Sequence, residues 1–352
     1  MAETKTQKAG TVDTTSGKLL EVDLKAGGNL HIFGWDQNHA KLTTQPEQEK
    51  LILETTDEGI RIEDRFNQDT GFDDAMDYTL YIPSFYNIRI RLLGGNIEIV
   101  GIRGNISGKT TGGNLKFIRL MGTIQFKTLG GDILIADSQL EGHVDSLSGR
   151  FLLENVKGDV KATSLTGNVI YKNVNGGDGE KDKRIVNMKT LGGNIDIGEA
   201  PNGAKVSTVD GEIHIKSASS FVEASTTNGD ILLENVNGEV NGVTINGDLH
   251  VNITGDGGIK HYHTRLTSST GDINLTIPVQ FTKNMELELI YPVNLTHKYK
   301  ISTPFNWGGE LIKSGKKGNN KQETTLRRYK TGKGFYKITI IIKRGDISIR
   351  EK

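Results

Sequence analysis

Apolar residues alternate with polar ones in short runs along most of the chain, and each run follows a glycine. In the stretch TLGGDILIAD (128–137), Ile133 and Ile135 lie two and four residues after Gly131. Alternation at period two is typical of a half-buried β-strand whose apolar side chains all point to one face. The other apolar pairs at these inward positions include Ile97/Ile99, Leu115/Phe117, Phe151/Leu153, Ile195/Ile197, Ile231/Leu233 and Leu249/Val251.

The glycines recur at a fixed period. They are Gly95, Gly113, Gly131, Gly149, Gly167, Gly193, Gly211, Gly229, Gly247 and Gly271. Successive spacings are 18 residues, except for two of 26 and 24 that contain polar, glycine-rich inserts around 175–183 and 254–263. Eighteen residues are too few for a βαβ unit, which needs roughly 30, but they suffice for two or three short strands. Because stacked units of this kind share one core, the sequence predicts an all-β, single-stranded parallel β-solenoid of about ten 18-residue coils.

Two polar columns accompany the glycines. Asn or Asp follows the glycine directly in most repeats, and Thr or Ser lies three residues before it. Side chains stacked in register can bond to one another and to the backbone of a turn. We therefore expect both columns to stabilise a corner of the coil, where the glycine adopts a positive φ.

The period is confined to residues 91–280. Residues 1–15 are expected to be a flexible N-terminus, and residues 16–90 keep the alternation without the period, which predicts a β-rich N-terminal cap. Residues 281–352 lose the spacing again and predict a C-terminal β cap with a basic loop. Caps are expected because the open end of a solenoid is an aggregation-prone edge.

Composition narrows the class of protein further. The chain has no cysteine, which excludes disulfides and thiolate metal sites. Its first ten residues do not form a signal peptide, and no apolar run is long enough to span a bilayer. The net charge is zero, but residues 1–90 hold 16 acidic and 9 basic side chains, whereas residues 281–352 hold 6 acidic and 16 basic. This asymmetry predicts an interaction surface.

Three stretches resemble one bacterial family. They are GWD (34–36) after an alternating strand, YTLYIP (78–83) leading into LLGGNIEIVGIRGNI (92–106), and the repeated T-x-G-G-[DN]-[IL]. Together they resemble DUF4097, a family of β-strand-repeat, adhesin-type domains, over about residues 16–350. The resemblance implies a right-handed β-helix of the bacterial envelope or cell surface, and so an extracytoplasmic location. It supplies no catalytic residues, and this chain lacks the signal peptide of many such proteins.

Histidines and acidic loops are the candidates for a metal site. His214 and His250 share an outward phase but lie two coils apart, about 10 Å by the strand spacing, too far to share one zinc ion. His261 and His263 have no further ligand in view, so solvated loop histidines are the preferred interpretation. The stretch NVNGGDGEKD (173–182) echoes a calcium loop but lacks the terminal Glu and the flanking helices of an EF-hand. No metal, cofactor or catalytic residue is predicted.

Two surfaces are candidates for partner binding. The candidate interaction patch consists of the aliphatic residues at outward positions of successive coils: Val100, Ile118, Leu134, Leu152 and Ile170. Grouped exposed aliphatics indicate binding more than scattered ones do, although a loop or cap that covers them would explain them equally well. The candidate basic patch consists of Lys313, Lys316, Lys317, Lys321, Arg327, Arg328, Lys330 and Lys333. It suits anionic lipid, polysaccharide or the acidic N-terminal end of another molecule. Tyr329 is nearly the only aromatic residue within it, which argues against nucleic acid.

Three hypotheses follow. The first is a non-enzymatic, adhesin-like envelope or surface protein that binds a protein or glycan, such as an envelope component, through its stacked faces. The second is a self-assembling scaffold similar to the bactofilins, with acidic and basic ends meeting head to tail. The third is a carbohydrate-active β-helix enzyme, which would need a cluster of carboxylates on one face, whereas the outward charges here are dispersed along the sequence.

Overall fold

The computed structural model describes residues 10–46, 51–64, 76–172, 185–255, 262–293, 295, 298–305, 312–314 and 324–352. The chain divides into two compact units, Met1–Gly177 (unit 1) and Asp178–Lys352 (unit 2). Both units consist of strands in two sheets, A and B, and the described residues form no α-helix. The all-β prediction is therefore confirmed. None of the helices in the described part of the chain is long and apolar enough to cross a membrane.

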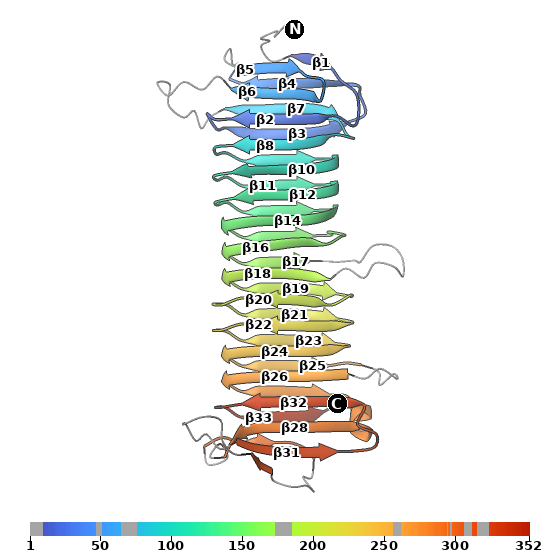
Figure 1. Ribbon diagram of the computed structural model, residues 1–352, viewed down its shortest axis with the longest axis vertical. Helices are drawn as coiled ribbons and strands as arrows, with labels where there is room; N and C mark the ends of the chain where they lie inside the picture. The colour runs from blue at the N-terminus through green and yellow to red at the C-terminus, as the bar shows by residue number, and fades with distance from the viewer. Residues whose placement is uncertain are drawn as a thin grey trace. The chain divides into compact units, whose positions relative to one another are not determined.

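In unit 1 the chain alternates between the two sheets and stacks its strands in parallel (Figure 1). Sheet A contains, in spatial order, β1 (Thr11–Asp13), β4 (His39–Gln45), β7 (Asp77–Pro83), β3 (Asn29–Trp35), β9 (Ile97–Val100), β11 (Leu115–Ile118), β13 (Ile133–Ala136), β15 (Phe151–Glu154) and β17 (Val169–Lys172). Sheet B contains, in spatial order, β5 (Leu51–Thr55), β6 (Gly59–Asp64), β2 (Leu19–Leu24), β8 (Asn87–Leu92), β10 (Arg103–Thr110), β12 (Met121–Thr128), β14 (Gln139–Ser148) and β16 (Val160–Thr166). From β10 to β17, each strand pairs with the strand 18 residues before it, as the period predicts.

The N-terminal end of unit 1 is folded back on itself. Strands β2 and β3 pair in parallel with β8 and β9, and β6 and β7 then pair with the other edges of β2 and β3. Strands β4 and β5 close this end because they run antiparallel to β7 and β6. Thr11–Asp13, expected in a flexible N-terminus, forms strand β1 and pairs with β4.

Unit 2 has the same two-sheet arrangement. Sheet A contains β19 (Ile195–Ala200), β21 (Ile213–Ala218), β23 (Ile231–Val236), β25 (Leu249–Ile253), β27 (Ile273–Ile277), β33 (Ile347–Glu351) and β29 (Ile301–Ser302). Sheet B contains β18 (Val186–Gly192), β20 (Ala204–Ser207), β22 (Phe221–Ser225), β24 (Glu239–Asn246), β26 (Tyr262–Thr270), β32 (Tyr336–Ile342), β28 (Met285–Pro292), β31 (Thr324–Lys330) and β30 (Ile312–Ser314). A 3₁₀ helix, η2 (Val279–Lys283), lies between β27 and β28.

The C-terminal strands return to the solenoid after an excursion. Strands β32 and β33 pair in parallel with β26 and β27, although about 70 residues separate them in the chain. Gly345 resumes the corner, because a Cβ on it would clash with the carbonyl oxygen of Gly271. Strand β28 lies outside β32, and β31 runs antiparallel to β28. The segment 281–352, predicted as a cap without the period, thus contains a further turn of the repeat.

The inward positions of both sheets form the core. Leu115 and Phe117 are both 0% exposed, and the Phe117 ring lies 5.3 Å from that of Phe126 on sheet B. Burial of these apolar side chains is the main driving force for stacking the coils, at about 25 cal/mol for each Å² removed from water. The predicted strand alternation is therefore confirmed.

The corner glycines are required by two constraints. Gly113 has a φ of 96°, and a Cβ on it would clash with the carbonyl oxygen of Gly95, one coil earlier. Nine of the ten corner glycines have φ between 96° and 156°. The exception, Gly211, has the same clash with the carbonyl of Gly193. Close backbone approach is thus a second reason for glycine, beyond the predicted positive φ.

Both polar columns bond as predicted. In the Asn/Asp column, the Asn96 side-chain oxygen accepts a 2.8 Å bond from the backbone N–H of Asn114, whose own side chain accepts a 2.9 Å bond from the N–H of Asp132. In the Thr/Ser column, the buried Thr128 hydroxyl donates to the Gly130 carbonyl over 2.8 Å. Each corner is therefore connected to the next by side chain to backbone bonds.

Candidate functional site

The candidate interaction patch lies on the outward face of sheet A in unit 1, in two rows that cross the strands. Leu134, Leu152 and Ile170 are paired in register on β13, β15 and β17 and are partly exposed. Val100 and Ile118 are paired in register on β9 and β11, two positions along the strand from the first row. Val100 is only 9% exposed, so it is the least accessible of the five.

The row of Val100 and Ile118 continues into aromatic residues of the N-terminal strands. Phe33 on β3 is in register with Val100, and Tyr81 on β7 is in register with Phe33. The Phe33 and Tyr81 rings stack with centroids 5.3 Å apart, and the Trp35 ring is also 5.3 Å from that of Tyr81. Tyr81 is 37% exposed. These aromatics and the five patch residues together form what we call the apolar band of unit 1.

Charged side chains border the apolar band. The His31 ring nitrogen Nδ1 lies 3.0 Å from a Glu98 carboxylate oxygen, and the Lys116 ammonium lies 3.9 Å from the other oxygen. Lys116 is in register with Leu134, so this cluster continues the row of leucines toward the N-terminal strands. The arrangement, an apolar centre with polar groups at its margin, is the composition typical of a protein-binding surface.

The sequence did not identify Phe33 or Tyr81 as site residues. They lie in strands without the 18-residue period, and the fold-back of β2–β7 is what places them beside Val100. The signal that was available is the alternation itself, which puts His31, Phe33 and Trp35 on the outward side of one strand.

The candidate basic patch is only partly described, since Lys316, Lys317, Lys321 and the side chain of Lys313 lie outside the described residues. Three of its described cations interact within the protein, and one of them, Lys333, lies with its ammonium 6.0 Å from the centre of the Phe335 ring. Arg328 donates two hydrogen bonds of 2.9 and 2.7 Å to Glu288, and the Arg327 guanidinium lies 5.8 Å from the centre of the Tyr291 ring. Lys330 and Lys333 are exposed. Arg327 and Arg328 therefore contribute to the packing of β31 against β28.

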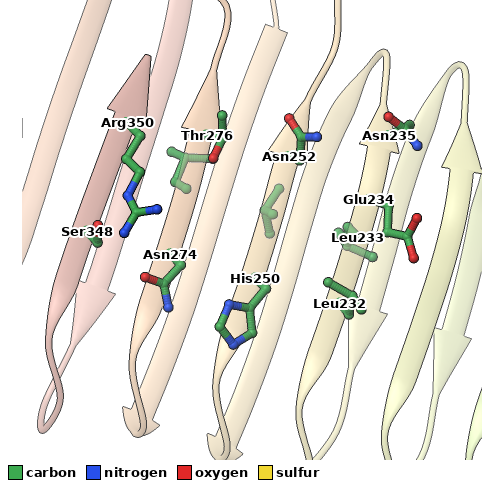
Figure 2. A pocket seen from close by; sticks show the side chains of 12 residues that line it. Leu232, Leu233, Glu234, Asn235, His250, Asn252, Asn274, Thr276, Ser348 and Arg350 are labelled. Atoms are coloured by element: carbon green, nitrogen blue, oxygen red, sulfur yellow. The ribbon is translucent and has the colours of Figure 1, made fainter. Parts of the chain in front are cut away.

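Unit 2 has a polar groove on the outward face of sheet A (Figure 2). It holds about 610 Å³ and crosses β23, β25, β27 and β33. Its side chains follow the coil repeat, with Leu232, His250, Asn274 and Ser348 in one register row and Asn252, Thr276 and Arg350 in another. Amides, hydroxyls, a histidine and an arginine thus line one strip.

A cluster of His and carboxylates borders this groove. His214 Nε2 lies 2.6 Å from Glu234 Oε1, and His214 Nδ1 lies 3.3 Å from Asp196 Oδ1. His214 and His250 are each paired with Leu232 from opposite sides, which places them two strands apart, as predicted. His261 and the stretch 173–182 lie outside the described residues. Among the residues that the structure describes, no group of three or more His, Cys, Asp or Glu is arranged to hold a metal ion.

Clear pKa shifts in the described residues are confined to three tyrosines, of which Tyr291 packs against Arg327 of the candidate basic patch. Burial raises the pKa of Tyr171, and the nearby negative charge of Asp159 raises it further. Burial also raises the pKa values of Tyr86 and Tyr291, partly offset by a hydrogen bond with Thr14 in the first and by the charge of Arg327 in the second.

The chain has little detectable similarity to known proteins. No protein-family model matches the chain, and no curated protein matches it. Among solved structures, the chain is similar to a crystal structure described as a "putative cell adhesion protein" from Clostridium sporogenes, with 11% identity, a TM-score of 0.18, and coverage of 98% of this chain and 100% of that chain. A similarity at this level carries no argument about function, which depends on the surfaces described above.

Proposed function

We propose that this chain is a non-enzymatic, adhesin-like β-solenoid that binds a partner at the bacterial envelope or cell surface. Its resemblance to the DUF4097 family supports this location and a right-handed coil. The binding surface is the apolar band of unit 1. A protein or a glycan of the envelope is the partner.

The apolar band supports this function because its residues lie in two neighbouring rows of sheet A and include aromatic side chains. Aromatic side chains are enriched among the residues that contribute most to binding energy at interfaces. Phe33 and Tyr81 lie at one end of the band, and their rings stack on each other. Because the two side chains are already ordered, a partner that binds to them costs little side-chain entropy. Aromatic faces on a rigid sheet suit both the apolar face of a sugar ring and an apolar protein surface.

A binding measurement with matched variants tests the proposal. Wild-type protein is passed over immobilised envelope polysaccharide and, separately, over solubilised envelope protein. Phe33→Ser combined with Tyr81→Ser is expected to weaken binding to one of the two by at least tenfold. Phe85→Ser is the control, because Phe85 is 52% exposed in the same unit but lies outside the apolar band. Equal binding by all three proteins would contradict the proposal.

Glycan hydrolysis is a second candidate function, favoured by the cluster of Asp196, His214 and Glu234. Paired carboxylates on one face are the requirement for acid–base cleavage of a glycosidic bond. Glu234 lines the polar groove of unit 2, and His214 links it to Asp196. The test measures the reducing ends that the protein releases from envelope polysaccharide. Release by the wild type that is abolished in Glu234→Gln would favour hydrolysis over simple binding.

Self-assembly is the third candidate. The antiparallel strands at the N-terminal end of unit 1 and beside β28 in sheet B of unit 2 favour the binding protein over it, because they interrupt the parallel stacking that an added coil would continue.

A further inference from the structure

Three cations occupy neighbouring strands of sheet B in unit 1. Arg91 on β8 is in register with Lys109 on β10, which is in register with Lys127 on β12. Directly paired like charges repel each other and destabilise a sheet. The outer two cations are partly compensated, since Arg91 lies 3.9 Å from Asp23 and Lys127 lies 3.8 Å from Asp145. Lys109, between them, has no ion pair with any residue that the structure describes.

An apolar groove lies beside this row of cations. It holds about 670 Å³, and Leu93, Thr111 and Leu129 line it at equivalent corner positions of three successive coils. Leu93 is 37% exposed and Leu129 is 55% exposed. The smaller Thr111 takes the equivalent position in the coil between the two leucines. Lys25, which lies 3.5 Å from a Glu63 carboxylate oxygen, adds a fourth cation to its lining, and Asp23 adds one carboxylate.

Gly112 follows Thr111 at this corner, and the backbone there does not require a glycine. Gly112 has a φ outside the left-handed region, and a Cβ on it would meet no atom within 4 Å. Ser148 and Thr166 take this position in later coils of the same unit, so larger residues are compatible with the corner. A glycine beside the groove leaves the backbone bare, which permits close approach of a ligand.

We propose that this groove docks unit 1 on the surface of a bilayer that contains anionic phospholipid. The leucines insert among the upper acyl chains, and the row of Arg91, Lys109 and Lys127 meets the phosphate groups. An anion alone would not use the exposed leucines, and an uncharged apolar partner would leave the repulsion between the three cations in place. An anionic lipid surface would bury the leucines and also neutralise the three cations. Cations near the membrane and inserted aliphatic side chains contribute together to interfacial binding. This inference is independent of the function proposed for the apolar band.

Vesicle flotation tests it with the full chain. The protein is mixed with phosphatidylcholine vesicles, or with vesicles of phosphatidylcholine and phosphatidylglycerol, in about 50 mM and about 500 mM salt, a range that strongly changes screening. We expect binding to the anionic vesicles alone, lost at the higher salt. Lys109→Gln is expected to weaken it roughly fivefold, about the contribution of one cation near a charged surface, and Leu129→Ser by roughly tenfold, from the lost apolar burial.

Two controls make the result specific. Ile245→Ser changes an exposed residue at the same corner position in unit 2, where Val243 replaces the cation, and is expected to bind as wild type. Lys109→Gln also removes a repulsion, so its unfolding midpoint should not fall. No flotation with anionic vesicles, or equal effects of Ile245→Ser and Leu129→Ser, would overturn the proposal. Equal binding to neutral vesicles would overturn the role of the cations.

Discussion

The backbone N–H of Asp346 donates a 2.8 Å hydrogen bond to the side chain of Asp272, although 74 residues separate the two in the chain. The same bond joins the equivalent Asp or Asn of adjacent coils elsewhere, for example Asp272 to Asp248 over 2.7 Å. The column of corner bonds thus continues through the segment that returns after η2. These bonds hold the terminal strand pair in register with the repeat.

Removing one acceptor from this column should destabilise unit 2. Asp272→Ala leaves the Asp346 N–H without its partner, and we expect a loss of about 1 kcal/mol in the free energy of unfolding. Asp272→Asn keeps an acceptor oxygen and should stay within about 0.5 kcal/mol of wild type. Urea unfolding followed by circular dichroism checks both. Equal losses in the two variants would show that charge, and not the corner bond, is what matters at this position.

Two adjacent glycines should respond very differently to alanine. Gly113→Ala places a Cβ against the carbonyl of Gly95 at a φ of 96°, which should cost about 1–3 kcal/mol from the strained backbone alone. Gly112→Ala meets open space, and its free energy of unfolding should be unchanged or slightly higher. Thermal unfolding of the two variants in parallel provides the comparison. Similar melting temperatures would argue against stacking of the coils at this corner.

Ionisation of Tyr171 should destabilise the protein at alkaline pH. Burial, and then the charge of Asp159, raises its pKa above the ordinary value of 10.0. The neutral phenol is favoured in the folded state, so its contribution to stability is complete below pH 10 and is lost as the pH rises further. Unfolding midpoints measured from pH 8 upward should fall less steeply in Tyr171→Phe than in wild type. Parallel curves would show that Tyr171 ionises equally in both states.

The protein should not polymerise end to end. Light scattering coupled to size exclusion is expected to give the mass of one chain in both about 50 mM and about 500 mM salt, because antiparallel strands flank the parallel strands of sheet B in each unit. Large species that dissociate at the higher salt would instead favour the head-to-tail scaffold.

The repeat could be predicted from the sequence because it depends on local rules. A glycine such as Gly131, with alternating apolar residues after it, specifies both a corner and an inward face, and both are present in the structure. The corner hydrogen bonds of the Thr/Ser and Asn/Asp columns follow from the same register. The patch of Leu134, Leu152 and Ile170 could be placed in one row for the same reason.

The fold-backs at the ends could not be predicted, because they depend on contacts between distant strands. Gly345 fits the corner pattern but is separated from Gly271 by an excursion with no fixed length. Phe33 and Tyr81 meet only because β7 pairs with β3 across the intervening β4–β6. The exposed Leu93 and Leu129 were not identified as a surface, since a corner position is neither inward nor outward in a strand alternation.

Hydroxyl-radical footprinting tests the central claim most directly, because it reads the solvent exposure of single side chains without any substitution. Oxidation of Tyr81, Phe33 and Leu134 is measured with and without bacterial envelope material, and the exposed Phe85 serves as the internal reference. Binding through the apolar band predicts a several-fold decrease in oxidation at the first three residues and none at Phe85. The account would be contradicted if the protein binds the material but Tyr81, Phe33 and Leu134 are oxidised as strongly as in the free protein.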